Sequence, residues 1–252
     1  MVAPENTLPS FHAAIAEGAA GVELDIRRTA DQALVCLHDA GLGRTTNGRG
    51  PVREHTLAEI RRLDAGAWFT RNGCAPYRGS GITVPTLTEA LDALPRGAMV
   101  DVEVKFRGAG EDGPRRVAEL LARTLEGRPD RDRIVVSSFS RRLAAAAVPR
   151  LDGVRVGLVT SALVPIGRAV RAAETSGCSV LAVQAAAYFG PMARAACSRA
   201  RGAGLLLMAW TVDEPETARR LADLGVEVIV ADRPGQLAAA LRVSPPGPGR
   251  PR

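Results

Sequence analysis

Short apolar runs rich in β-branched residues alternate along this sequence with longer segments of helical periodicity. The strand-like runs lie at 21–26, 99–105, 133–138, 154–159, 179–183, 205–210 and 227–231. The helical segments lie at 8–17, 86–94, 114–126, 140–149, 163–176, 190–203, 213–224 and 233–242. This alternation is typical of a parallel sheet with right-handed helical crossovers. It predicts an α/β fold of the TIM (β/α)₈ barrel type in which one strand is not visible.

We expect one barrel domain over 1–242. The extended run at 33–37 follows the first strand too closely for a crossover helix, which predicts a hairpin extension. The region 41–85 is irregular and rich in Gly, Arg and Thr, and it includes a short helix near 56–63. We interpret it as an inserted loop over one barrel mouth. The Pro/Gly-rich tail 243–252 is predicted to be disordered.

Two of the predicted helices have a recognisable first turn. Thr86 followed by Glu89 has the spacing of a capping box, as does Asp213 followed by Glu216. In such a box the first side chain accepts a backbone N–H of the helix, and the second reaches back. Both helices are therefore predicted to begin at these positions.

Composition excludes several classes of function. The net charge is +6, but the arginines are dispersed and aromatic residues are only 4%, so we expect no nucleic-acid partner. No apolar run is long enough to span a bilayer, and no leader pattern is visible, so we expect a soluble, cytoplasmic protein. The cysteines lack metal-site spacing and are predicted to be reduced thiols. The oligomeric state stays open.

Carboxylates occupy one face of two strand-like runs. Side chains alternate across a strand, so Glu23 and Asp25 share a face in the first run. Asp101, Glu103 and Lys105 share a face in the next. For either run alone, a half-exposed strand with its polar side in water is the simpler interpretation. It fits poorly here, because strands followed by helices are normally covered on both faces.

A divalent cation would balance inward carboxylates, which cannot stay ionised when buried without a partner. Oxygen ligands favour Mg²⁺ or Ca²⁺ over zinc. Of the 33 basic residues only Lys105 is a lysine, and its position in this cluster favours a functional ammonium. His38 ends the 33–37 run beside Asp39, a possible orienting partner, although a surface loop histidine is about as plausible from these residues alone.

Several motifs, taken in order, resemble the glycerophosphodiester phosphodiesterase family. They are Pro-Glu-Asn-Thr at 4–7, Glu-x-Asp at 23–25, Thr-x-Asp at 29–31, His-Asp at 38–39, and Arg-Thr-Thr-Asn-Gly-x-Gly at 44–50. Later matches are "VPTLTEAL", "VDVEVK", "VVSSFS", "MAWTVDEPE" and "VIVADRP". The resemblance covers about residues 3–240. It departs at Asp213, where Asn is usual, and at Ala231, where Thr is common.

The resemblance implies a TIM barrel that hydrolyses glycerophosphodiesters to an alcohol and glycerol 3-phosphate with a divalent metal. It implies that His38 protonates the leaving alkoxide and that Lys105 offsets the charge of the phosphate. It assigns no role to Asp101. The metal ligands that it implies are Glu23, Asp25 and Glu103. The residues that it places at the mouth are Phe139 and Trp210.

One motif of the family has no counterpart in the sequence. In the family a strand ending in His-Arg-Gly directly precedes Pro-Glu-Asn-Thr and supplies a second acid–base histidine, but this sequence starts at Met1, after that place. General acid–base catalysis is worth about 10²–10⁴-fold, so we expect impaired turnover in this chain and a natural start further upstream. His12 and His55 lie on no matching motif.

Two other functions stay open. A barrel that binds a phosphodiester or a metal without turnover accounts for the absent histidine, but gives no reason to keep the carboxylate set and the single lysine. A related phosphodiester lyase also uses a TIM barrel with carboxylate-bound Mg²⁺, and would release a cyclic phosphate. The complete Arg-Thr-Thr-Asn-Gly segment and the Trp-Thr-Val strand favour the hydrolase.

Overall fold

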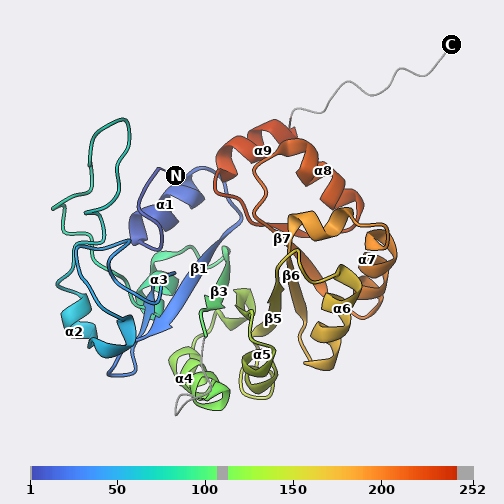
Figure 1. Ribbon diagram of the computed structural model, residues 1–252, viewed down its shortest axis with the longest axis horizontal. Coiled ribbons are helices and arrows are strands. Elements are labelled where there is room, and N and C mark those ends of the chain that lie inside the picture. Colours follow the sequence, from blue (N-terminus) through green and yellow to red (C-terminus); the bar gives the residue numbers. More distant parts are fainter. Residues whose placement is uncertain (1, 107–112, 243–252) are drawn as a thin grey trace.

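The computed structural model describes residues 2–106 and 113–242 (Figure 1). The strands within them are β1 (Gly21–Arg28), β2 (Leu34–Cys36), β3 (Met99–Val104), β4 (Ile134–Ser138), β5 (Arg155–Thr160), β6 (Val180–Gln184), β7 (Leu206–Trp210) and β8 (Val228–Ile229). They form one sheet in the order β2-β1-β3-β4-β5-β6-β7-β8. Every neighbouring pair is parallel except β1 with β2. The predicted parallel sheet and its hairpin extension are confirmed, whereas the predicted tail lies outside the described residues.

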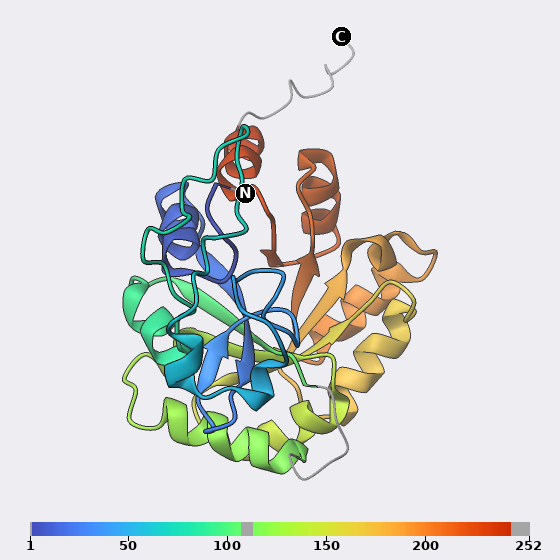
Figure 2. The ribbon, with the colours of Figure 1, turned by 60° about the vertical axis from the view of Figure 1, so that its left-hand side comes forward.

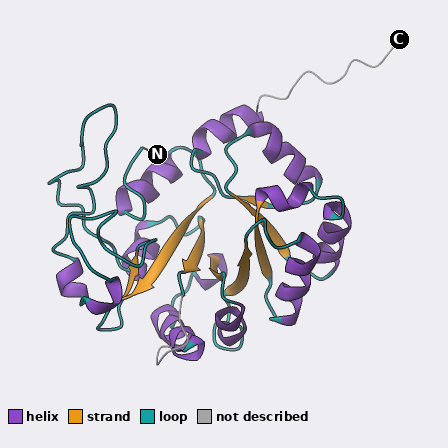
Figure 3. Ribbon diagram, in the orientation of Figure 1, coloured by secondary structure: helices purple, strands orange, loops and turns teal. Residues whose placement is uncertain are grey.

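Helices follow most of the strands and lie outside the sheet (Figure 3). They are α1 (Leu8–Ala16), α2 (Leu57–Ile60), α3 (Leu87–Ala93), α4 (Pro114–Leu125), α5 (Arg141–Ala147), α6 (Ile166–Thr175), α7 (Ala193–Gly202), α8 (Pro215–Asp223) and α9 (Pro234–Arg242). Short 3₁₀ turns are η1 (Val52–Glu54), η2 (Arg131–Arg133) and η3 (Ala185–Phe189). This βα alternation gives the predicted TIM-barrel-like architecture.

Side-chain alternation divides the core into an outer and an inner part. Val100, Val102 and Val104 of β3 pack with the helices in the largest apolar cluster. A smaller cluster gathers inward-facing residues, including Val135 of β4 and Met208 of β7. The inner face of β3 carries polar side chains instead. The inward face of the sheet is therefore apolar on one part and lined by carboxylates on another.

The sheet is curled, and two helices come into contact between the first and last of its parallel strands, β1 and β8. Within the described residues no ladder pairs β8 with β1. Helices α1 and α9 nevertheless meet, because the backbone N–H of Gly235 donates to the carboxylate of Glu17 at the end of α1 (3.4 Å) (Figure 2). The C-terminal end of α1 therefore contacts the start of α9 where the described sheet is open.

The segment 41–85 packs with β2 around a small apolar core that is separate from the main one. Val35 and Leu37 pack there against Leu42, Val52 and Ile60. The short helix α2 supplies Ile60. Burial of these side chains gives the segment a fixed conformation although it has little regular secondary structure.

One of the two predicted capping boxes forms. Thr86 accepts the N–H of Glu89 (3.2 Å), and the Glu89 carboxylate accepts the N–H of Thr86 (2.9 Å). The box predicted at Asp213 was wrong. Its carboxylate accepts the backbone N–H groups of Asp232 and Arg233 instead, and α8 begins at Pro215.

Among the described residues, no helix combines the length and apolar character that a membrane crossing requires.

Candidate active site

The β1–β3 register places the predicted carboxylates side by side. Glu23 lies opposite Asp101 and Asp25 opposite Glu103 in the parallel ladder. Alternation directs them to the face opposite the outer core, and Asp25, Asp101 and Glu103 are buried. Glu23, Asp25 and Glu103 each offer an oxygen that lies within 4.8 Å of the others. The structure thus brings together the three residues expected to bind a metal.

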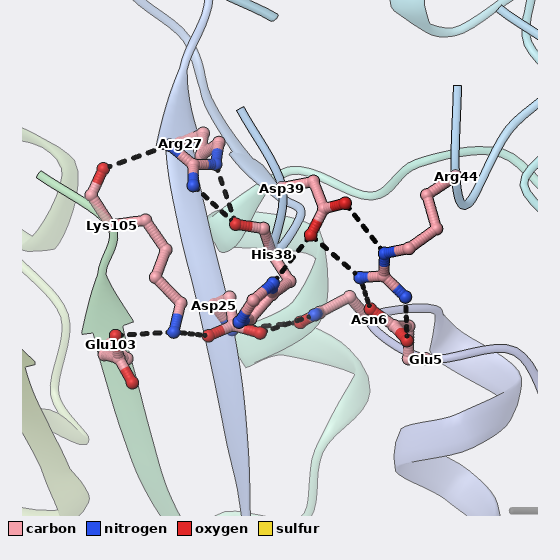
Figure 4. A network of polar contacts seen from close by, with 9 residues as sticks. All are labelled: Glu5, Asn6, Asp25, Arg27, His38, Asp39, Arg44, Glu103 and Lys105. Carbon is pink, nitrogen blue, oxygen red and sulfur yellow. Dashed lines mark hydrogen bonds and ion pairs between the residues drawn. The ribbon is translucent and has the colours of Figure 1, made fainter. Parts of the chain in front are cut away.

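Lys105 neutralises part of this negative charge. Its Nζ lies 2.9 Å from Asp25 Oδ1 and 2.6 Å from Glu103 Oε1 (Figure 4). Burial lowers the pKa of Lys105, but the two carboxylates outweigh burial and the net pKa is raised. The ammonium therefore stays charged at the centre of the cluster.

The Lys105 ammonium alone does not balance the negative charge of the whole cluster. Burial first, and then the neighbouring carboxylates Asp25, Asp101 and Glu103, hold the pKa of Glu23 well above its usual range. Burial is also the main cause that raises the pKa of Asp101 to about 7. Clustered carboxylates with raised pKa values gain from a further positive charge. Three adjacent carboxylate oxygens suit a hard divalent cation, so the residues present fit the metal that the sequence predicts.

His38 is part of a chain of charged groups beside the cluster. Its Nδ1 lies 2.8 Å from Asp39 Oδ1. Arg44 donates from Nε to Asp39 (2.8 Å) and from Nη1 to Glu5 (2.8 Å). The hydrogen bond from Arg44, with that from His38, lowers the pKa of Asp39 to about 2. An ionised Asp39 favours a proton on Nδ1, which leaves Nε2 as the ring nitrogen that can take up a proton and donate it.

Two further side chains, those of Asn6 and Arg27, make contacts beside the cluster on β1. Asn6 donates from Nδ2 to Asp25 Oδ2 (2.8 Å), and its Oδ1 accepts the backbone N–H of Asp25 (2.9 Å). Arg27 donates to the backbone oxygens of His38 and Lys105 (Figure 4). Asn6 thus fixes one carboxylate of the cluster. Arg27 links the segment that follows β2 to the segment that follows β3.

The predicted aromatic residues lie together near Lys105. The rings of Phe139 and Trp210 pack edge to face with centroids 5.7 Å apart. Lys105 Nζ lies 6.0 Å from the Phe139 centroid. Phe139 is half exposed, whereas Trp210 Nε1 is buried without a hydrogen-bond partner among the described residues. These rings therefore form an apolar wall beside the charged cluster.

The other histidines contact backbone oxygens elsewhere. His12 Nε2 lies 3.2 Å from the carbonyl oxygen of Ala93, and His55 Nδ1 lies 2.9 Å from that of Pro51. Among the described residues, His38 is thus the histidine that lies with the carboxylate cluster.

Four residues that contact the site have contacts that the sequence does not predict. Glu5, Asn6 and Arg44 belong to recognised motifs, but the motifs do not say what these side chains contact. Arg27 belongs to no motif, and its only signal is the alternation that places it on the face of Glu23 and Asp25.

Known proteins share both this sequence pattern and this fold. Residues 1–236 match the model of the Glycerophosphoryl diester phosphodiesterase family. The glycerophosphodiester phosphodiesterase of Bacillus subtilis is 31% identical over 92% of this chain and 80% of its own length.

Two solved structures have the same architecture. One is a phosphodiesterase from Oleispira antarctica in complex with the product sn-glycerol-3-phosphate, with TM-score 0.78, 26% identity and coverage of 95% of this chain and 92% of that one. The other is a glycerophosphodiester phosphodiesterase from Agrobacterium tumefaciens, with TM-score 0.73, 31% identity and coverage of 94% of both chains. Together with the match over residues 1–236, they show that this chain is a hydrolase of the glycerophosphoryl diester phosphodiesterase family.

Proposed function

We propose that this chain hydrolyses glycerophosphodiesters to an alcohol and glycerol 3-phosphate, with Mg²⁺ or Ca²⁺ held by Glu23, Asp25 and Glu103. The observation that carries the proposal is the cluster of three carboxylates, with His38 and Lys105 beside it. The relative from Oleispira antarctica, which holds sn-glycerol-3-phosphate, supports the assigned product. The partner is a small molecule, and its alcohol stays open.

A divalent cation bound by these carboxylates supplies Lewis acidity toward phosphoryl oxygens. Lys105 adds a second positive charge beside the phosphate, and Asn6 keeps the carboxylate of Asp25 oriented. The rings of Phe139 and Trp210 bound the mouth with an apolar wall.

His38 donates the proton that the departing alkoxide needs. Asp39 holds the Nδ1 side of the ring, so that the Nε2 side carries the transferred proton. His12 and His55 contact backbone oxygens, so we propose that residues 1–252 work with a single acid–base histidine and turn over slowly. A second such group is worth about 10²–10⁴-fold.

The test is ³¹P NMR of purified protein incubated with a glycerophosphoalcohol and Mg²⁺ or Ca²⁺. Glycerol 3-phosphate should accumulate in wild type, disappear with a chelator, and fall about 10²–10⁴-fold in His38→Ala. His38→Ala should slow hydrolysis of a p-nitrophenyl ester of glycerol 3-phosphate much less, because the leaving p-nitrophenolate needs no proton.

The same spectra separate the alternatives. Substrate binding without hydrolysis, equal in wild type and His38→Ala, would support a non-catalytic barrel. A cyclic phosphate as the final product would support a lyase. Either result contradicts the proposed hydrolysis.

A further inference from the structure

We propose that Arg27 is a positioning residue that fixes the distance between His38 and Lys105. Its guanidinium spans the two chain segments that carry these side chains. The inference rests on the proposed role of His38 as proton donor, and it concerns a residue outside every motif of the family resemblance.

The contacts of Arg27 come from all three of its nitrogens. Nε and Nη2 lie 2.9 Å and 2.6 Å from the backbone oxygen of His38. Nη1 lies 3.3 Å from the backbone oxygen of Lys105. The two bonds to His38 have the short lengths expected of a charged donor, the bond to Lys105 is longer, and the planar guanidinium fixes their relative directions.

The topology makes this bridge specific to the site. Strand β1 lies between β2 and β3 in the sheet. His38 follows β2, and Lys105 follows β3. The backbone of Arg27 is itself paired with Val35 in the β1–β2 hairpin. A rigid strand thus carries the group that joins the two neighbouring strand ends.

His38 is consequently held at two points. Arg27 holds its backbone oxygen, and Asp39, backed by Arg44, holds its ring. The ring contact sets the tautomer, while the backbone contact sets where the ring lies relative to the Lys105 ammonium. A displacement of about 1 Å at such a site can cost on the order of 10²-fold in rate.

Three variants separate positioning from other roles. Arg27→Met removes the bridge. Arg27→Lys keeps the positive charge, but one ammonium does not reproduce the fork that reaches both backbone oxygens. Arg53→Met is the matched control, because Arg53 is an exposed arginine of η1 whose guanidinium lies 3.4 Å from Glu54, its neighbour in sequence.

We expect kcat on the glycerophosphoalcohol to fall about 10- to 100-fold in both Arg27 variants, with KM little changed. On the p-nitrophenyl ester kcat should fall at most a few-fold, as in His38→Ala. Arg53→Met should match wild type on both substrates. An equal loss on both substrates in the Arg27 variants, or a higher KM on both, would overturn the positioning role and indicate general destabilisation or direct phosphate binding. Near wild-type activity of Arg27→Lys would show that charge alone matters.

A second readout needs no turnover. Hydrogen–deuterium exchange of the substrate-free protein should be about tenfold faster in the peptide spanning 36–41 in Arg27→Met, and unchanged in Arg53→Met. Unchanged exchange in Arg27→Met would overturn the inference even if no substrate were turned over. If instead His38→Ala slows hydrolysis of both substrates equally, the proposed role of His38 as proton donor fails. That result is distinct from a failure of the Arg27 inference.

Discussion

Lys105 lies between two carboxylates of the cluster, Asp25 and Glu103. The exposed fractions of the three side chains are 15%, 9% and 12%, so all three are mostly withdrawn from water. Mutual attraction is strong where water is largely excluded, and removal of one partner leaves the others uncompensated. A divalent cation held by Glu23, Asp25 and Glu103 would therefore share two of its carboxylates with the ammonium.

Replacement of this lysine should separate stability from cation binding. In a chelator, Lys105→Met should lower the free energy of unfolding by about 3 kcal/mol, because the carboxylates lose their partner. The same variant should bind Mg²⁺ or Ca²⁺ more tightly than wild type and hydrolyse substrate poorly. Urea unfolding and calorimetric titration measure the two effects, with Lys105→Arg as the charge-conserving control. An unchanged cation affinity would contradict the shared site.

Some site residues could be predicted from the sequence, and others could not. Alternation alone places Glu23 and Asp25 on one face, and the single lysine in the second run marks the centre of the cluster. The partners of Arg27 could not be predicted, because they are backbone oxygens and any residue supplies one. The pairing of Glu5 with Arg44 joins motifs far apart in sequence, so spacing does not reveal it either.

At the scale of elements, the start of β4 is tied to α3 by a buried ion-pair cluster. Asp130 accepts hydrogen bonds from Arg128 (3.0 Å) and Arg133 (2.9 Å). Arg133 also donates to the backbone oxygen of Leu91 in α3 (2.8 Å). Burial raises the pKa of Asp130, but the two arginines outweigh burial and lower it to about 2. Asp130 thus keeps its charge well into the acid range.

This cluster should control acid stability. A carboxylate whose pKa is lower in the folded than in the unfolded protein stabilises the fold above the unfolded pKa, and this contribution is lost as pH falls through the folded value. The window here runs from about pH 4 down to about pH 2.

Asp130→Asn should lower the unfolding free energy at pH 7 by about 2 kcal/mol and change less between pH 4 and pH 2 than wild type. Urea unfolding at several pH values measures both. Asp132→Asn, at an exposed aspartate of the same η2 turn, is the control and should follow wild type. Parallel acid losses in Asp130→Asn and wild type would show that Asp130 does not carry the effect.

The two predicted capping boxes show what local sequence can and cannot decide. Thr86 and Glu89 find their partners within one helical turn, so spacing is sufficient. Asp213 has the same spacing but binds the backbone after β8, and the helix begins later, at Pro215. Whether such an aspartate caps the helix depends on whether a long-range partner competes for its carboxylate, and the local sequence does not show such a partner.

At the scale of the whole molecule, periodicity was sufficient for the fold. The alternation of strands and helices predicted the parallel sheet, and residue positions along it predicted which face is polar. The contact between α1 and α9 was not predictable, because it joins Glu17 to Gly235 across almost the whole chain. The carboxylate cluster lies on β1 and β3, which the architecture places next to each other.

The central claim is that three carboxylates on two adjacent strands bind one divalent cation. Isothermal titration of Mg²⁺ and Ca²⁺ into the purified chain tests it most directly. We predict one site per chain in wild type, affinity at least about tenfold lower in Glu103→Gln, and unchanged affinity in Glu174→Gln, whose carboxylate pairs with Arg199 at the surface. Absence of saturable binding in wild type, or equal affinity in Glu103→Gln, would contradict the claim.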